Sequence, residues 1–363
     1  MTAPQPKPGL TEIAPYVGGE SEIEGKSHVI KLASNEGALG ASPKAVEAYK
    51  AAAESMYRYP DGECVRLRRA LADFHGIKFE NIVCGAGSDE IFGLLCHAYV
   101  GPGDETVQGA HAFLMYAIQT RAFGGTPVQV PEKNLHVDVD AMLAAVNERT
   151  KIVFVANPNN PTGTYVPADE LHRLREELRD DILLVIDSAY AEYMESDDYT
   201  AGVDLVEAGD NVVMTRTFSK IYAMGGMRLG FAYCPPAVAD VLNRVRHAFN
   251  VTSAAQAAGI AALKDQEFVE RSREHNRRWL AWTIQQFRGM GLEVPDSYGN
   301  FVLVRFPEED GKNAAAADKF LKEAGIIVRR MGVYGLPDYL RISIGLEDEM
   351  RKVADVLGQF VAK

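Results

Sequence analysis

Apolar and polar positions alternate in blocks along the middle of the chain. Between residues 60 and 265, stretches with the apolar spacing of helices are separated by short apolar runs at 81–85, 126–130, 151–156, 182–187 and 211–215. Short apolar runs between helices are typical of strands buried in a largely parallel sheet. The pattern therefore predicts a doubly wound α/β domain.

The two ends of the chain have different patterns. The first 40 residues are rich in Pro, Gly and Glu, with no helical period before Ser42, which can cap a helix that starts with Pro43. Beyond residue 265, a long charged helix and strands near 300–306 and 339–345 predict a smaller α+β domain. We expect an arm at 1–42, a large domain at 43–265 and a small domain at 266–363, with the arm and the small domain closing over a site on the large domain.

Composition narrows the function classes. The 363 residues, 47% hydrophobic and 24% charged, match an ordinary globular protein of two domains. A net charge of −12 makes nucleic acid an unfavourable partner. The four cysteines form no CxxC pair and have no histidine at ligand spacing, so we expect reduced thiols and no metal site. Neither a signal-peptide core nor a run approaching about 20 apolar residues is found, so we expect a cytoplasmic protein without a membrane partner.

Ligands of open α/β sheets bind where strands end, so we searched the loops after the apolar runs. Residues 84–95 pass from a strand through small residues into a helix that begins near Ser88, where free N–H groups favour an anion. Gly87, Ser88 and Asp89 are the candidate phosphate cradle. The alternative is a tight, capped turn with no ligand.

Two further loops carry polar groups at strand ends. Residues 156–163 contain two prolines, and Asn160 can offer its amide to the crevice, although a rigid turn would explain the same residues. Asp187 ends a wholly apolar run, where a carboxylate is costly unless a cation or a donor meets it. The ring nitrogen of a cofactor would be such a partner, and Tyr190 can reach the same ligand. Helix capping by Asp187 is the alternative.

The segment 215–233 holds the densest chemistry. Thr217, Ser219 and Arg228 offer hydroxyls and a guanidinium to a phosphate. Lys220 lies among apolar residues, which can lower its usual pKa of about 10.4 enough for it to act as a nucleophile and base.

Taken in order, four segments resemble the signature of the class I/II aminotransferases of fold type I, which use pyridoxal phosphate: GAGSDE, NPNNPTG, DSAY and TFSKIYAMGGMRLG. Five segments nearer the ends are similar to the histidinol-phosphate aminotransferase subfamily: IAPYVGG, LASNE, YRYPDG, IIVRR and YLRISIG. The resemblance covers nearly the whole chain. It implies a large domain with a mainly parallel seven-stranded sheet between helices, a smaller α+β C-terminal domain, and a homodimer with shared active sites.

The resemblance also implies the roles of the residues that bind the cofactor. Lys220 would carry the cofactor as a Schiff base and move the substrate proton. Asp187 would pair with the ring nitrogen, and Asn160 and Tyr190 would bind the 3′-oxygen of the ring. Phe113 would stack on the ring, where the family often has tyrosine. The cofactor phosphate would be bound by Gly87, Ser88, Thr217, Ser219, Arg228 and, from the other subunit, Tyr59.

For the substrates, the resemblance implies that Arg341 binds the α-carboxylate and that Arg329 binds either the substrate phosphate or the side-chain carboxylate of glutamate. Asn35 belongs to the same substrate-binding set, and Tyr16 would cover the aromatic part. The implied reaction interconverts L-histidinol phosphate and 2-oxoglutarate with imidazole-acetol phosphate and L-glutamate, a step of histidine biosynthesis.

Three other functions are compatible with these motifs. Relatives of the subfamily act on aromatic keto acids, so an aromatic or dual-specificity aminotransferase is the first alternative. A phosphothreonine decarboxylase is the second. The third is a cofactor-binding sensor fused to a DNA-binding module, which would need a helix-turn-helix segment where the chain has about 40 proline-rich residues.

Overall fold

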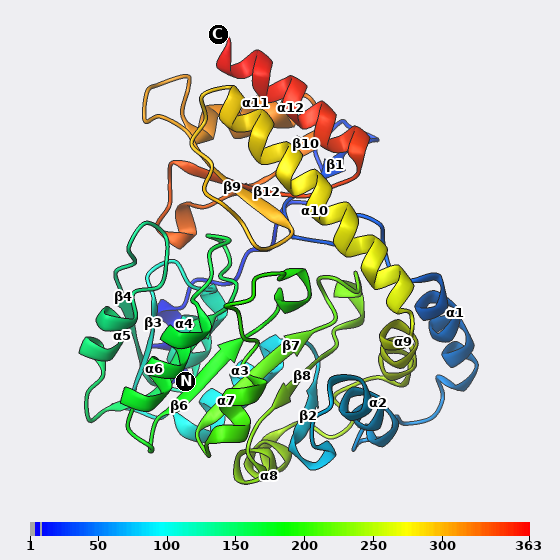
Figure 1. The fold of residues 1–363 in the computed structure, drawn as a ribbon, viewed down its shortest axis with the longest axis vertical. Coiled ribbons are helices and arrows are strands. Elements are labelled where there is room, and N and C mark those ends of the chain that lie inside the picture. The colour runs from blue at the N-terminus through cyan, green and yellow to red at the C-terminus, as the bar shows by residue number, and fades with distance from the viewer. Residues whose placement is uncertain (1–3, 8) are drawn as a thin grey trace.

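The computed structural model describes residues 4–7 and 9–363 and is built around a seven-stranded sheet (Figure 1). The strands lie in the order β2 (Ile82–Gly85), β8 (Gly230–Tyr233), β7 (Val212–Thr217), β6 (Leu183–Asp187), β5 (Thr150–Ala156), β3 (Glu105–Gly109) and β4 (Thr126–Val130). Strands β7, β6, β5, β3 and β4 are parallel, whereas β8 runs antiparallel to both of its neighbours. The expected mainly parallel seven-stranded sheet is confirmed.

Two strands of the seven-stranded sheet lie outside the apolar runs that predict strands. Strand β3 has the sequence ETVQG and is buried along its whole length although three of its five residues are not apolar. Strand β8 falls within the glycine-rich segment that was interpreted as part of the site. The predicted run at 126–130 is indeed a strand, but it is largely exposed because β4 forms the edge of the sheet and pairs only with β3.

Helices cover both faces of this sheet. Apolar residues on one face pack with α2 (Val65–His75), α5 (Val139–Ala145), α6 (Ala168–Glu177), α7 (Val203–Ala208) and α9 (Ser253–Lys264). The other face packs with α3 (Ser88–Tyr99), α4 (Leu114–Ala122) and α8 (Pro236–Val245). Helix α1 (Pro43–Ala52) packs on α9, and Ser42 caps it as predicted by accepting N–H groups from Lys44 and Ala45. The doubly wound arrangement is therefore confirmed.

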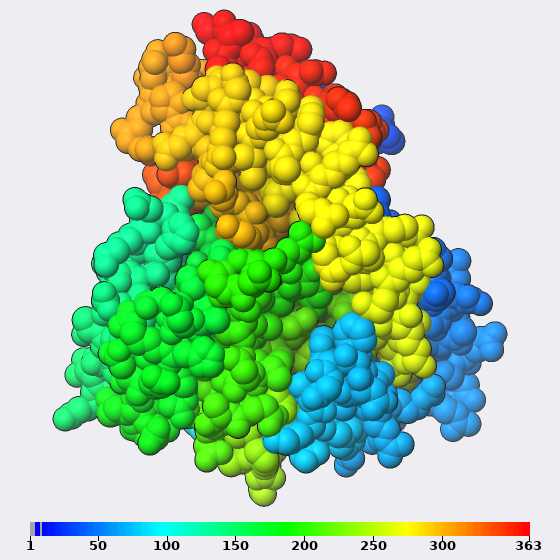
Figure 2. Space-filling view, in the orientation of Figure 1, coloured from blue at the N-terminus to red at the C-terminus, as the bar shows by residue number. Residues whose placement is uncertain are grey.

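The C-terminal part has its own sheet and its own core. Its antiparallel sheet has the order β11 (Arg329–Arg330), β12 (Tyr339–Ser343) and β9 (Phe301–Arg305). The surrounding helices are α10 (Gln266–Gly289), α11 (Ala314–Glu323) and α12 (Glu347–Val361). Figure 1 shows α10 running from beside α9 in the large part along the small part, and in Figure 2 side chains of the two parts meet along a broad boundary.

The N-terminal segment joins the small part through β1 (Ile30–Lys31), which pairs in parallel with β10 (Ile326–Ile327). The segment then enters α1 at Ser42, whose hydroxyl donates to Asp265, and Lys44 forms an ion pair of 2.8 Å with the same carboxylate. Residues 42 and 265 are therefore adjacent in space, at the place where the chain enters and leaves the large part. We propose 42/43 and 265/266 as the domain boundaries.

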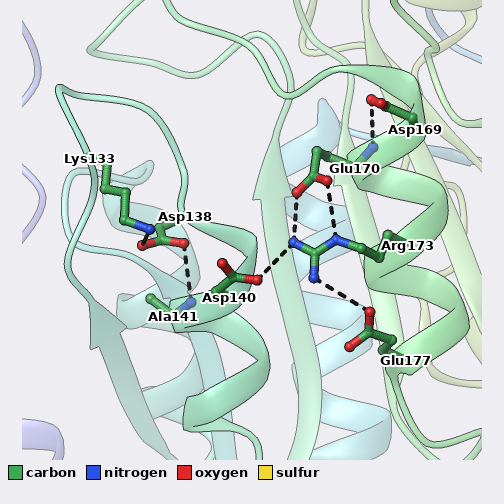
Figure 3. Close-up of polar contacts among 8 residues, drawn as sticks. All are labelled: Lys133, Asp138, Asp140, Ala141, Asp169, Glu170, Arg173 and Glu177. Carbon is green, nitrogen blue, oxygen red and sulfur yellow. Dashed lines mark hydrogen bonds and ion pairs between the residues drawn. The ribbon is translucent and has the colours of Figure 1, made fainter.

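An exposed set of ion pairs links α5 to α6 on the outside of the large part (Figure 3). The Arg173 guanidinium lies 2.7 Å from Glu170, 3.0 Å from Asp140 and 3.4 Å from Glu177. We call these four residues the Arg173 cluster.

Candidate active site

A cavity of about 350 Å³ lies where the large sheet, the small part and the N-terminal segment meet. All but two of the predicted site residues line it: Tyr16, Asn35, Ser88, Phe113, Asn160, Asp187, Tyr190, Thr217, Ser219, Lys220, Arg228, Arg329 and Arg341. The exceptions are Gly87, which precedes Ser88 at the start of α3, and Tyr59, which lies elsewhere. The fold thus brings together residues that are more than 300 positions apart in the sequence.

Lys220 lies in a loop that leaves β7 and returns into β8. The loop is closed by hydrogen bonds from the Phe218 amide to the Leu229 carbonyl and from the Met224 amide to the Phe218 carbonyl, both 2.9 Å. Phe218 and Leu229 are buried in the core below the loop. This anchoring fixes the backbone of Lys220 and leaves its amine directed into the cavity, where Nζ lies 3.4 Å from the Ser34 carbonyl oxygen.

The surroundings of Lys220 make its amine easier to deprotonate than an ordinary lysine. Burial, reinforced by the charge of Arg341, lowers the pKa of Lys220 to about 8. No carboxylate in the described part of the chain forms an ion pair with Nζ. A lysine in this state is a nucleophile and a base near neutral pH, as the sequence suggested.

Asp187 ends β6 with its carboxylate 6% exposed, and no cation is paired with it among the described residues. Tyr116 donates a hydrogen bond of 2.6 Å to one carboxylate oxygen, and Thr215 donates a longer one of 3.4 Å to the other. Burial raises the pKa of Asp187 to about 6, although the hydrogen bond from Tyr116 opposes the rise. Beside it, Asn35 donates to the Tyr190 hydroxyl at 2.9 Å, and burial raises the pKa of Tyr190 to about 12.

One end of the cavity is built for an anion. Helix α3 begins at Ser88, so its first N–H groups have no helical acceptor. The Arg228 guanidinium lies beside this helix end, 3.0 Å from Asp89 and 3.5 Å from the Ser219 hydroxyl, and Thr217 donates to Ser219 at 3.0 Å. A Cβ on Gly87 would lie 2.4 Å from the Arg228 guanidinium, so only glycine leaves room for this approach.

The cavity also carries two further arginines with different surroundings. Arg341 is 5% exposed and donates to Asn160 and to the Ala33 carbonyl, but it has no carboxylate partner among the described residues, and its Nε has no acceptor there. Arg329 is more exposed and donates to the carbonyls of Val17 and Gly18, next to Tyr16. A buried guanidinium without a carboxylate is costly, and an anionic ligand would offset that cost.

These residues fit pyridoxal phosphate on four counts. The helix end with Arg228 suits a phosphate, and the buried carboxylate of Asp187 suits a protonated ring nitrogen. Phe113 offers an aromatic face, and the Lys220 amine can bond to an aldehyde.

The sequence did not single out two residues of the site. Tyr116 is fully buried below the cavity, and its signal was its position three residues after Phe113, on the same side of a helix. Tyr334 lines the cavity from the short 3-10 helix η6 (Gly332–Tyr334), where nothing in the sequence pattern marked it.

Among residues 4–7 and 9–363, no group of three or more His, Cys, Asp or Glu side chains is placed to hold a metal ion. No helix in that described part is long and apolar enough to cross a membrane.

Comparison with known proteins gives the class to which this fold and site belong. Residues 27–357 match the family model described as aminotransferase class I and II. The expected aminotransferase class and fold type are confirmed.

The relatives narrow the family further. A protein described as histidinol-phosphate aminotransferase in Paramagnetospirillum magneticum is 59% identical over 361 residues, covering 99% of each chain. One with the same description in Rhodospirillum rubrum is 56% identical and covers 99% of this chain and 97% of its own. The crystal structure of histidinol-phosphate aminotransferase from Sinorhizobium meliloti, in complex with pyridoxal 5′-phosphate, superposes with a TM-score of 0.90 at 29% identity, covering 99% of this chain and 98% of that one. The chain belongs to the histidinol-phosphate aminotransferase family.

Proposed function

We propose that this enzyme uses pyridoxal phosphate to transfer an amino group between L-histidinol phosphate and 2-oxoglutarate, in the histidine-biosynthetic direction from glutamate to imidazole-acetol phosphate. The observation that carries the proposal is Arg341, a buried guanidinium without a carboxylate partner in the described chain, in the same cavity as the low-pKa amine of Lys220. An amino acid or keto acid substrate brings the missing carboxylate to Arg341. Its reacting carbon would then lie in the cavity that Lys220 also lines.

The bound cofactor supplies an electron-withdrawing ring that stabilises the negative charge on the substrate Cα once its proton has left. Asp187 keeps the ring nitrogen protonated, which maintains this withdrawal. Asn160 and Tyr190 bind the ring oxygen, and Phe113 packs on the ring face. The phosphate is held by the α3 end at Gly87 and Ser88 together with Thr217, Ser219 and Arg228.

Lys220 has two tasks in this proposal. It holds the cofactor when no substrate is bound, and after substrate displaces it, the free amine moves a proton at the substrate Cα. Its pKa of about 8 suits both tasks because the amine exists in both protonation states near neutral pH.

The substrates are bound by other residues of the cavity. Arg341 holds the α-carboxylate of glutamate, with Asn35 supporting Tyr190 next to it. Arg329 binds the side-chain carboxylate of glutamate or, when histidinol phosphate is bound, the phosphate, which is the anionic group of that substrate. Tyr16, which lies beside the arm carbonyls that Arg329 contacts, covers the imidazole.

We also propose that the enzyme is a homodimer with shared sites. Tyr59 is 83% exposed and stacks on Phe249 at 4.8 Å, and Met56 and Tyr57 beside it are also exposed. A contiguous apolar patch of this kind supports a subunit interface, from which Tyr59 reaches the phosphate end of the partner's cavity. The four buried free cysteines support a reducing compartment, the cytoplasm.

A half-reaction panel tests the amino-group transfer. The cofactor-loaded protein is titrated separately with L-glutamate, L-histidinol phosphate, L-tyrosine and L-phenylalanine while the absorbance of the bound cofactor is followed. We expect glutamate and histidinol phosphate to change the band at the lowest concentrations. A response to tyrosine and phenylalanine in preference to histidinol phosphate would replace the proposal with an aromatic aminotransferase, and no response to any donor would refute aminotransfer.

A mixed-dimer experiment tests the shared site. Lys220→Ala and Tyr59→Ala subunits are each prepared alone and then mixed after partial unfolding. Because a hybrid dimer contains one site with neither substitution, we expect activity to reappear on mixing. Two inactive variants that stay inactive after verified exchange would contradict the sharing of sites.

A further inference from the structure

Tyr116 is a buried tyrosine in direct contact with the carboxylate of Asp187. It lies in α4, is fully buried, and donates a hydrogen bond of 2.6 Å from its hydroxyl to Asp187 Oδ2. Its ring is fixed on two sides, stacked on Phe154 at 4.7 Å with an angle of 2° and met edge-on by Phe92 at 5.0 Å. The hydroxyl therefore has little freedom to point elsewhere.

Tyr116 also contacts the aromatic face of the cavity. Phe113, at the start of α4, meets the Tyr116 ring edge-on at 5.8 Å. The helix itself is tied to the sheet below, because Thr120 donates to the Tyr116 carbonyl at 2.8 Å and lies 2.8 Å from the Thr106 hydroxyl in β3. One rigid element thus positions both the carboxylate and the ring that we assigned to the cofactor.

We propose that Tyr116 is a positioning residue that keeps Asp187 ionised and directed at the ring nitrogen of the cofactor. The inference rests on the proposed function. Asp187 also accepts from Thr215 and from the Ala189 amide, and of the two side-chain donors Tyr116 at 2.6 Å is closer than Thr215 at 3.4 Å. Hydrogen bonds to an ionised carboxylate are stronger than neutral ones, so their loss favours the protonated acid, which cannot pair with a pyridinium.

Several charged or titratable groups surround Asp187 besides Tyr116. The charge of Asp89 in α3 raises the pKa of Asp187. The charge of Asp187 in turn raises the pKa of Lys220, which follows β7. Tyr190 and Tyr199, on the segment after β6, have their own pKa values raised partly by the Asp187 charge. The hydrogen bond from Tyr116 lowers the pKa of Asp187, whereas Asp89 and burial raise it. Removal of Tyr116 should therefore raise the pKa of Asp187 further.

The test compares cofactor binding by the ligand-free full chain and by a Tyr116→Phe variant. The probes are pyridoxal 5′-phosphate and its 1-deaza analogue, in which a carbon replaces the ring nitrogen. For pyridoxal phosphate we expect affinity at neutral pH to fall about tenfold in the variant, and the acidic midpoint of binding to move to higher pH. For the deaza analogue, which has no nitrogen for Asp187 to pair with, we expect equal affinity in both proteins.

Tyr99→Phe is the matched control, since it removes a hydroxyl from a partly buried tyrosine in α3, which the structure does not connect to Asp187. It should leave both affinities unchanged. If Tyr116→Phe unfolds, Thr215→Val removes the weaker donor and should shift the same pyridoxal phosphate midpoint by a smaller amount in the same direction.

Equal losses for the two probes would show that Tyr116 acts only through packing, and no loss for either would also overturn the inference. Both results leave the proposed function intact if the natural protein binds pyridoxal phosphate and transaminates. Failure of the natural protein to bind pyridoxal phosphate at all would instead refute the proposed function.

Discussion

The cavity and the Arg173 cluster are both rich in charged residues, but these residues differ in burial and in pairing. In the cluster, Arg173 is surrounded by three carboxylates at 2.7–3.4 Å, and all members are exposed to solvent or nearly so (Figure 3). In the cavity, Asp187 and Arg341 are almost fully buried, and neither forms an ion pair within the described chain. Lys220 is likewise unpaired and has its pKa lowered by burial.

The difference distinguishes surface charges that pair with each other from buried charges that a ligand would pair. Exposed pairs contribute little to the free energy of folding because water solvates them almost as well when they are apart. A buried charge without a counter-charge generally costs several kcal/mol. A fold that keeps three such charges around one cavity therefore indicates that a bound molecule supplies the opposite charges. Substitutions in the cavity should therefore affect function far more than substitutions in the Arg173 cluster.

The largest effect is expected from Lys220→Ala. The substitution removes the amine that binds the cofactor and moves the substrate proton, so we expect turnover to fall by at least about 10³-fold. The fold should persist, because the loop is anchored by Phe218 and Leu229 rather than by the lysine side chain. Steady-state rates and a thermal melt measure the two parts separately. Near-normal activity in the variant would remove Lys220 from the chemistry.

The next effect is expected from Arg341→Gln. Without the buried guanidinium the substrate α-carboxylate loses its cation, and we expect kcat/KM for glutamate to fall about 100-fold. Arg305→Gln is the matched control on the neighbouring strand β9, since Arg305 is exposed and pairs with Glu293 at 3.1 Å. If both variants lose the same amount, the effect comes from disturbing the small sheet and not from the carboxylate.

The pH dependence of cofactor binding tests the state of Lys220. Its pKa is lowered to about 8, so the fraction of neutral amine, and with it the rate of covalent binding, should rise about tenfold per pH unit below that value and level off above it. Rapid-mixing absorbance on the ligand-free protein measures this rate. Pyridoxine 5′-phosphate has no aldehyde, so its binding should lack the rise. A midpoint near the ordinary 10.5 would show that burial does not lower the pKa of Lys220.

The fold was largely predictable because its signals are local. The apolar runs at 151–156, 182–187 and 211–215 became β5, β6 and β7, and the charged stretch after residue 265 became α10. Strand β3 was not predicted because Glu105, Thr106 and Gln108 are polar residues. They are buried by residues that are distant in the sequence, and the local pattern does not show this burial.

The site was predictable where each residue sits in a motif, as Asn160, Asp187 and Lys220 do, and less so where contacts cross the chain. No motif near Tyr116 predicts that its hydroxyl donates a hydrogen bond to Asp187, which is 71 residues away in the sequence. The bond from Arg329 to the carbonyls of Val17 and Gly18 spans more than 300 residues. It shows that Arg329 holds the arm beside Tyr16 as well as lining the cavity, a second contact that the motif IIVRR did not suggest.

The smallest effect is expected from Arg173→Gln, which breaks the exposed contacts between α5 and α6. Each pair is solvated and screened, and the remaining carboxylates can turn to water, so we expect unchanged kcat/KM and only a slight fall in thermal midpoint. Because salt already weakens such pairs, that slight fall should shrink further at high ionic strength. A loss of activity comparable to that of Arg341→Gln would break the contrast between the two regions, since it would mean that surface charge on the outside of the large sheet sets the chemistry inside the cavity.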